Sequence, residues 1–195
     1  MHDEGDIVKR IEDLTGQIKR AYRQFACVMP LERITVSLIC KELDISRKAF
    51  YTRFESREMV LESILRDDMI APIKAMYPAL TRTISEQASM NIVNEQVFQA
   101  IADHGEFYMR LVALNEEKLV SHVLQKCYLE AQEYARVVGG VPESEEFEYA
   151  SRFLSAANAA MVIHWLRGGM KTPIPAMAQW FGTWSTPAVM SIAKK

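Results

Sequence analysis

The stretch RITVSLICKELDISRKAFYTRFESREMV, residues 33–60, holds two short amphipathic segments that meet at a tight corner. Thr35 is a favourable N-cap for the first segment and Ser46 for the second. Each cap is flanked by an apolar pair spaced to form a hydrophobic staple, Ile34 with Ile39 and Ile45 with Phe50. Asp44 falls at the corner, and Asp tolerates the left-handed conformation that turns a chain there. The pattern predicts a helix, a tight turn and a second short helix.

The second helix of this pair, expected over residues 46–54, divides into two faces. Phe50 and Phe54 are four residues apart and share the inward face. The outward face carries two cations, a phenol and a hydroxyl, from Arg47, Lys48, Tyr51 and Thr52. The major groove of B-DNA admits one α-helix, and such side chains reach base edges and phosphates. The segment therefore indicates a helix-turn-helix that presents this helix to double-stranded DNA.

Charge is unevenly distributed along the chain. The 195 residues carry a formal net charge of −2, yet residues 18–57 hold nine basic and four acidic residues, so that this window is +5 and the remainder −7. A basic module on an acidic body is a localised electrostatic footprint for nucleic acid. Charge alone favours an ordinary solvated surface over a nucleic-acid site.

The segment ITVSLICKELDISRKAFYTRFESREMVLESIL, residues 34–65, resembles the DNA-binding segment of the TetR/AcrR family of transcriptional regulators, and the resemblance extends over about residues 18–65. The positions that match the family pattern in order and spacing are Thr35, Leu43–Ser46, Phe50–Tyr51, Phe54 and Ser56–Arg57–Glu58. Three positions depart from it: Asp44 replaces the turn glycine, Lys48–Ala49 replaces Gly-Thr, and Glu55 replaces a lysine.

The resemblance implies an all-α protein of about nine helices with two domains. Residues 1–55 would form a three-helix DNA-binding domain, and residues 56–195 a helical domain for ligand binding and dimerisation. The implied function is a homodimeric, ligand-responsive transcriptional regulator, a repressor, that binds a palindromic operator. Its predicted DNA-binding residues are Thr35, Ser37, Ser46, Arg47, Lys48, Tyr51, Thr52 and Arg57. The alternative is a co-regulator of the same fold that acts mainly through a protein partner, and Ala49 and Glu55 keep it open.

Helical periodicity continues through the rest of the chain. A first helix is expected to end near Val28, because Pro30 disfavours helix at the preceding residue. A fourth helix is expected from Ser56 toward Ile70, with Pro72 kinking or ending it. The later helices are expected over residues 91–102, 105–114, 117–138, 143–167 and 175–193. Two roles stay open for the first ~15 residues, an arm on DNA or an extension of the first helix.

Residues 147–166 form an apolar stripe with two interpretations. It is either a buried core helix or a helix that packs against its copy in a two-fold dimer. In the resembled family the last two helices form a four-helix dimer interface, which favours the dimer. The predicted interface residues are Leu154, Ala157, Asn158, Met161, Trp165, Trp180 and Trp184.

A small-molecule pocket in the second domain is a further hypothesis. Such sites need apolar walls with a few polar tips, and the candidates are Met76, Tyr77, Phe98, Phe107, Tyr108, Tyr128, Met161 and His164. Methionines and aromatics at helical spacing also occur in any helical core, so both interpretations remain open. The sequence does not identify the effector.

Other function classes find little support. The four histidines stand alone, and the chain has no His-Glu-x-x-His motif, Gly-rich phosphate loop or nucleophile elbow, so no enzyme, metal or cofactor is expected. Three cysteines without paired spacing indicate small core residues in a reducing compartment. No signal peptide or membrane span is apparent, which predicts a cytoplasmic protein with no membrane partner.

Overall fold

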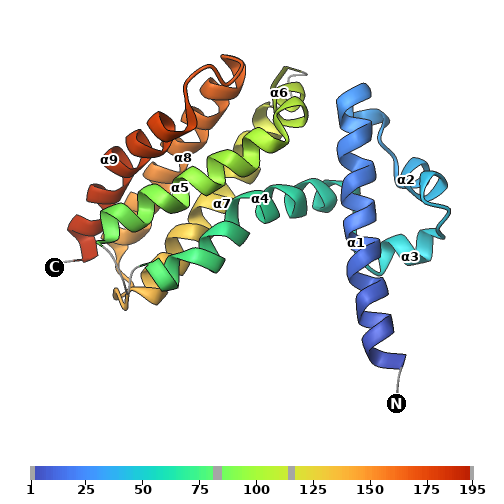
Figure 1. Ribbon diagram of the computed structural model, residues 1–195, viewed down its shortest axis with the longest axis horizontal. Coiled ribbons are helices and arrows are strands. Elements are labelled where there is room, and N and C mark those ends of the chain that lie inside the picture. The colour runs from blue at the N-terminus through green and yellow to red at the C-terminus, as the bar shows by residue number, and fades with distance from the viewer. Residues whose placement is uncertain (1–2, 81–84, 114–116, 194–195) are drawn as a thin grey trace. The chain divides into compact units, whose positions relative to one another are not determined.

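The computed structural model describes the backbone of residues 3–80, 85–113 and 117–193, and their side chains except at residues 3–13, 77, 86, 87, 117 and 186–193. Within these ranges the secondary structure is entirely helical, with nine α-helices and one 3-10 helix (Figure 1). The all-α prediction is therefore confirmed. No described helix is long and apolar enough to cross a membrane. The chain divides into two compact units, Met1–Ile64 and Leu65–Lys195.

The N-terminal unit contains α1 (Asp3–Val28), η1 (Leu31–Arg33), α2 (Val36–Glu42), α3 (Arg47–Tyr51) and the start of α4 (Arg57–Leu80). The first helix ends at Val28 as predicted, and the opening residues lengthen it. The third helix is shorter than expected: Thr52 is its C-cap and residues 52–53 form a turn. The core of this unit is apolar and closely packed, with Ile18, Ile34, Ile39 and Phe50 fully buried.

The corner between α2 and α3 is a Schellman turn centred on Asp44. Asp44 has a φ of 50°, so the predicted left-handed residue is confirmed. The amide of Ile45 donates to Cys40 O at 2.9 Å, and that of Asp44 to Lys41 O at 3.4 Å. These bonds satisfy carbonyls that the end of α2 leaves without helical partners. The corner is thus fixed by the backbone, and it sets the direction in which α3 starts.

The C-terminal unit holds the rest of α4 and five further helices, α5 (Glu86–Asp103), α6 (Gly105–Ala113), α7 (Glu117–Val138), α8 (Glu145–Arg167) and α9 (Ile174–Ala193). Helix α9 packs against α5 and α8, and α8 packs against α7 (Figure 1). Two helices extend further than predicted. Helix α4 continues through Pro72 and Pro78, so Pro72 does not end it, and α5 begins five residues before the predicted start, at Glu86.

Edge-on aromatic packing joins three helices in the core of this unit. The Phe98 ring of α5 contacts Trp165 of α8 with centroids 5.3 Å apart, and Phe181 of α9 at 4.8 Å. Tyr128 of α7 reaches the same Phe181 ring at 5.9 Å. The indole Nε1 of Trp165 donates to Thr172 O at 2.9 Å, which satisfies its one polar atom. These rings fix the register of α5, α7, α8 and α9 around one core.

Candidate nucleic-acid interface

Helix α3 presents a polar face to solvent and an aromatic face to the core. Phe50 is fully buried and Phe54 is 5% exposed, and their rings lie 6.1 Å apart. On the opposite side Tyr51 is 52% exposed and meets the edge of Phe50 at 5.5 Å. Arg47, Lys48 and Thr52 are exposed beside it. The structure thus places all four residues of the predicted outward face on one accessible surface.

Two of the predicted DNA-binding hydroxyls cap helices. Thr35 Oγ1 accepts from the amide of Leu38, and Ser46 Oγ accepts from the amide of Ala49, both at 3.1 Å. Such caps hold the first turn of a helix. Both residues are exposed. Each cap therefore fixes the end of its helix at the surface of the unit.

A hydrogen bond from α3 to α2 orients Arg47. Its Nη2 donates to Ser37 Oγ at 2.6 Å, and both side chains are exposed. The same guanidinium lies close to Cys40: burial raises the pKa of that thiol, and the positive charge of Arg47 opposes the rise. Arg47 is therefore held against α2, and its direction is set by a residue outside its own helix.

The end of α3 is closed by Thr52. Its Oγ1 donates to Ala49 O at 2.8 Å and accepts from Arg53 Nη1 at 2.5 Å. The Thr52 hydroxyl thus satisfies a carbonyl at the helix end, and a phosphate contact through it would have to replace a bond within α3. Arg53, which sequence reasoning did not select, is half-buried and linked to this hydroxyl.

Arg57 joins α4 to the segment before α2. Its Nη1 donates to the carbonyls of Leu31 at 2.5 Å and Ile34 at 3.0 Å, while its Nε pairs with Glu58 at 2.7 Å. Arg57 was predicted to bind DNA. In the structure these donors serve the fold of the N-terminal unit, because they satisfy the carbonyls at both ends of η1. No sequence signal separates this use of an arginine from a phosphate contact.

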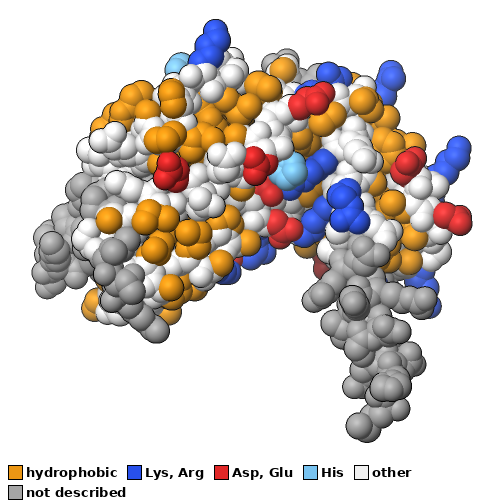
Figure 2. Space-filling view, viewed as in Figure 1, with side chains coloured by type: hydrophobic (Ala, Val, Ile, Leu, Met, Phe, Trp, Pro, Cys, Tyr) orange, Lys and Arg blue, Asp and Glu red, His pale blue; other side chains and the backbone are white. Residues whose placement is uncertain are grey.

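Lys and Arg side chains are spread over the surface of the N-terminal unit, with a few acidic ones between them (Figure 2). Around α3 itself, Arg47 and Lys48 lie at the start of the helix and Glu55 follows its end, and all three are exposed. The positive charge is therefore greatest at the N-terminal end of α3. In helix-turn-helix proteins the N-terminal residues of this helix contact base edges.

Comparisons with known proteins concern the C-terminal region of the chain and its fold. A family profile described as "Transcriptional regulator C-terminal region", TetR_C_8, matches residues 90–184. Together with the helix-turn-helix pattern, this match over just under half of the chain supports a TetR-family transcriptional regulator. Among solved structures, the "Dihydroxyacetone kinase operon activator DhaS" shares the fold, with a TM-score of 0.60 and 15% identity over 92% of this chain and 97% of DhaS.

A second similar structure is RolR in complex with resorcinol, with a TM-score of 0.49, 12% identity, and coverage of 96% of this chain and 97% of RolR. No curated protein sequence matches the chain. The family assignment of the C-terminal region complements the helix-turn-helix pattern, which lies in the part of the chain before residue 90.

The residues predicted to line a pocket in this TetR-family protein fall in different environments. Tyr128 and Phe98 belong to the aromatic core, and Phe107 and Tyr108 are buried on α6, where Tyr108 OH donates to the Asp68 carboxylate at 2.5 Å. Met76 and Met161 are half-buried and His164 is exposed, whereas the side chain of Tyr77 lies outside the described residues. The pocket prediction stays a prediction.

The residues predicted to form the dimer interface also differ in their burial. Trp165 is 4% exposed, Leu154 5% and Asn158 9%, and Asn158 Oδ1 accepts from Ser185 Oγ at 2.8 Å. These three side chains are packed within the protomer. Met161 is half-buried, and Ala157, Trp180 and Trp184 are exposed.

Sequence reasoning missed two large aromatic residues on the outer side of α8. Tyr149 is 69% exposed and Phe153 is 73% exposed. They are four residues apart and therefore share one face of the helix. That face lies off the apolar stripe from which the interface was predicted. A pair of aromatics off the main stripe is the signal that would have indicated a second apolar face.

Proposed function

We propose that this TetR-family regulator is a homodimeric, ligand-responsive repressor that binds a palindromic operator through the segment of residues 46–54, which contains α3. Each protomer would set α3 in the major groove, at a distance of ~34 Å from its mate or a longer compatible one. The observation that carries the proposal is the orientation of α3: Phe50 and Phe54 are buried, while Arg47, Lys48 and Tyr51 are exposed together.

The recognition surface has the chemistry for both parts of DNA binding. A guanidinium forks onto guanine O6 and N7, and Arg47 is already oriented by Ser37. Lys48 and the Tyr51 hydroxyl suit phosphate oxygens, which position a protein on the duplex. Buried Phe50 and the capped start of α3 hold these side chains on a rigid element.

Exposed aromatic residues on each of the last two helices support the homodimer. Tyr149 and Phe153 lie on α8, and Trp180 and Trp184 on α9, where the two indoles stack with centroids 5.8 Å apart. Apolar side chains gather over α9 in Figure 2. Exposed apolar patches of this kind mark interaction sites, and a two-fold axis brings the same patch of each protomer together.

The ligand response requires an effector that binds the two states of the dimer with different affinity. We place the effector in the C-terminal unit, and its binding would favour a state whose two recognition helices no longer match the operator. Activation is the alternative to repression, since the similar protein DhaS is an operon activator. A reporter gene under the selected operator would decide the sign of regulation.

The alternative is a co-regulator that acts mainly through a protein partner. Two features of the recognition helix favour it. Ala49 is half-buried and offers no hydroxyl to a phosphate, and Glu55 is exposed just beyond α3, where it would repel the DNA backbone. Both features weaken operator affinity without altering the fold.

Selection of bound duplexes from random DNA tests the proposal. Wild-type protein is expected to enrich a palindrome, and Arg47→Ala/Lys48→Ala/Tyr51→Ala to lose it, because the variant removes the outward face of α3. Lys118→Ala/Lys171→Ala is the control, since it removes two exposed cations from the C-terminal unit. Failure of folded wild-type protein to enrich any sequence at low and moderate salt would contradict the proposal and favour the co-regulator.

A further inference from the structure

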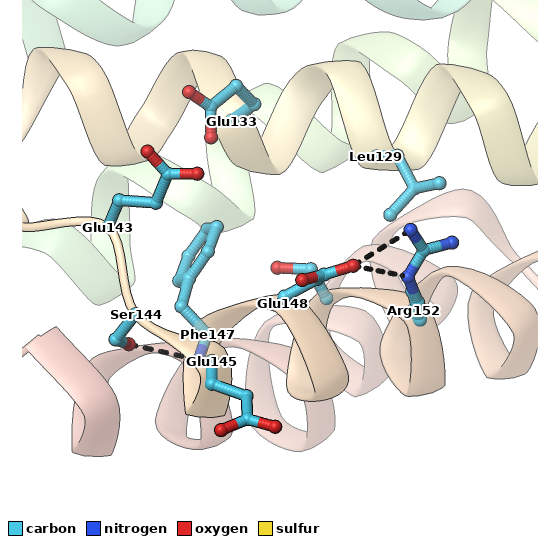
Figure 3. A pocket seen from close by; sticks show the side chains of 9 residues that line it. Leu129, Glu133, Glu143, Ser144, Glu145, Phe147, Glu148 and Arg152 are labelled. Atoms are coloured by element: carbon cyan, nitrogen blue, oxygen red, sulfur yellow. Dashed lines mark hydrogen bonds and ion pairs between the residues drawn. The ribbon is translucent and has the colours of Figure 1, made fainter.

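A groove of about 590 Å³ lies between the C-terminal half of α7 and the N-terminal end of α8, and we call it the α7–α8 groove (Figure 3). Its size is within the range of small-molecule sites. None of its lining residues belongs to the predicted pocket or dimer sets. The lining residues are Leu129, Glu133, Glu143, Ser144, Glu145, Phe147, Glu148, Ser151 and Arg152.

The groove combines an apolar floor with carboxylates. Phe147 points into the space between the two helices, and Leu129 of α7 lies further along it (Figure 3). Glu143 lies on one side of the Phe147 ring and Glu148 on the other, whereas the carboxylate of Glu145 points away from α7 (Figure 3). A ligand in the groove would therefore meet negative charge on both sides of a hydrocarbon surface.

The charges of the groove are only partly balanced. Four glutamates and one arginine line it, and Arg136 pairs with the lining Glu133, so the formal net charge is −2. Arg152 Nε and Nη2 both donate to the same oxygen of Glu148, Oε1, at 3.2 and 2.9 Å. Neither bond uses Oε2. The acids of the first turn of α8 also favour the helix dipole, but that role leaves the outer carboxylate oxygens available to a cation.

One end of the groove already holds a cation. The guanidinium of Arg136 lies 5.8 Å from the centroid of Phe147 and donates to both oxygens of Glu133 at 2.7 and 2.6 Å. The hydrogen bonds from Arg136 hold the pKa of Glu133 below its ordinary value. The Phe147 ring and the Glu133 carboxylate therefore accommodate the positive charge of Arg136, and the guanidinium donors have acceptors there.

Ser151 supplies an independent indication of a ligand. It lines the groove and is 6% exposed, yet its buried Oγ has no hydrogen-bond partner among the described residues. Buried hydroxyls are nearly always paired, and an exception in a native protein calls for an explanation. A donor arriving from the groove would satisfy this oxygen. Among common ligand groups, an ammonium brings three donors and the charge that the glutamates favour.

We propose that the α7–α8 groove binds a small aliphatic polyamine. Its methylene chain would lie on Phe147 and Leu129, one ammonium would pair with Glu143, and another would pair with Glu148 and donate to Ser151 Oγ. This binding does not depend on the DNA-binding proposal, because it involves the C-terminal unit alone and is measured without DNA.

Titration calorimetry of the full chain with spermidine tests the proposal. Wild-type protein is expected to bind it saturably, and more tightly than it binds butylamine, which has a single charge. Ser151→Ala is expected to weaken binding about tenfold, the size expected for a hydrogen bond to a charged group. Glu143→Gln is expected to weaken it about threefold to tenfold, and both effects should diminish with added salt.

Glu146→Gln is the matched control. It removes the same charge from the first turn of α8 at an exposed residue that does not line the groove, so it should leave spermidine binding within about twofold. Thermal unfolding of Ser151→Ala should show no loss of stability, since the hydroxyl makes no bond in the protein. The proposal would be overturned if spermidine gave no saturable heat, or if the control and groove variants lost equal affinity for spermidine. Equal binding of Mg²⁺ would also overturn it. Saturable binding of a lysine-rich peptide without spermidine binding would also do so.

Discussion

Ser37 and Arg47 are ten residues apart in the chain, and the corner at Asp44 brings them within 2.6 Å. The contact was not predictable from spacing within either helix, because it depends on how the turn directs α3. Both residues are exposed, so the bond adds little to folding stability. Its effect is on the guanidinium, which is held near one orientation before any DNA contact is made.

Ser37→Ala is expected to weaken operator binding roughly fivefold, about 1 kcal/mol, because the Arg47 guanidinium loses the hydroxyl oxygen of Ser37 that accepts its hydrogen bond. Anisotropy titration against the selected operator and a scrambled duplex would measure the effect. Ser37→Thr retains a hydroxyl and should stay near wild type. Equal losses on both duplexes would show instead that Ser37 contacts the phosphate backbone directly.

At the scale of the element, α4 shows why some helix ends escape prediction. Proline removes a helical hydrogen bond and disfavours continuation, yet α4 passes through Pro72. Arg66 and Lys74, on either side of that proline, both bind Glu130 Oε1 of α7, at 2.8 and 2.9 Å. Contacts with α7 thus hold both halves of α4 in place. The rule that proline ends a helix considers neighbouring residues alone, so it cannot account for these contacts.

Glu130→Gln is expected to lower the free energy of unfolding by about 1 kcal/mol at low salt and neutral pH. Burial acts to raise the pKa of Glu130, but hydrogen bonds from Lys74 and Arg66 outweigh it, and the net pKa is below the ordinary value of 4.5. A carboxylate whose pKa is lower in the folded state than in the unfolded state stabilises the fold at pH values above its unfolded-state pKa. The difference from wild type should therefore be constant above about pH 5 and vanish as the pH falls through the lowered pKa.

Denaturant unfolding across pH would measure this difference. Glu133→Gln is the control, since Glu133 pairs with Arg136 within α7. Loss of this pair should lower the free energy of unfolding by less than about 0.5 kcal/mol. A loss from Glu130→Gln that persists well below pH 4 would contradict a charge-based role.

Local signals predicted much of the fold. The end of α1 at Val28, the left-handed Asp44, the caps at Thr35 and Ser46, and both ends of α7 followed from residue patterns. Which surface of α8 is buried did not, because that depends on α7 and α9. For the same reason the prediction selected Trp165, which is buried within the protomer, and did not select Phe153, which is exposed. The α7–α8 groove was missed because its acids have the ordinary pattern of a helix start.

At the scale of the whole molecule, the exposed aromatic residues of α8 and α9 would govern the dimerisation that we propose. Phe153→Glu is expected to convert the proposed dimer largely to monomer, because it places a charge on an apolar surface that the dimer would bury. Sedimentation velocity would measure the change. Val137→Glu, at a residue of α7 that is 61% exposed, is the control and should leave association unchanged. A Phe153→Glu protein that sediments as wild type would contradict the assignment of this face.

The distribution of tryptophan gives the protein an intrinsic optical signal. All three tryptophans of the chain lie on α8 and α9. Trp165 is buried and bonded to Thr172 O, so its emission is insensitive to solvent, whereas Trp180 and Trp184 are 41% and 59% exposed. Unlabelled protein should therefore shift its fluorescence to shorter wavelength on association through α8 and α9. Dilution alone would then report the monomer–dimer equilibrium.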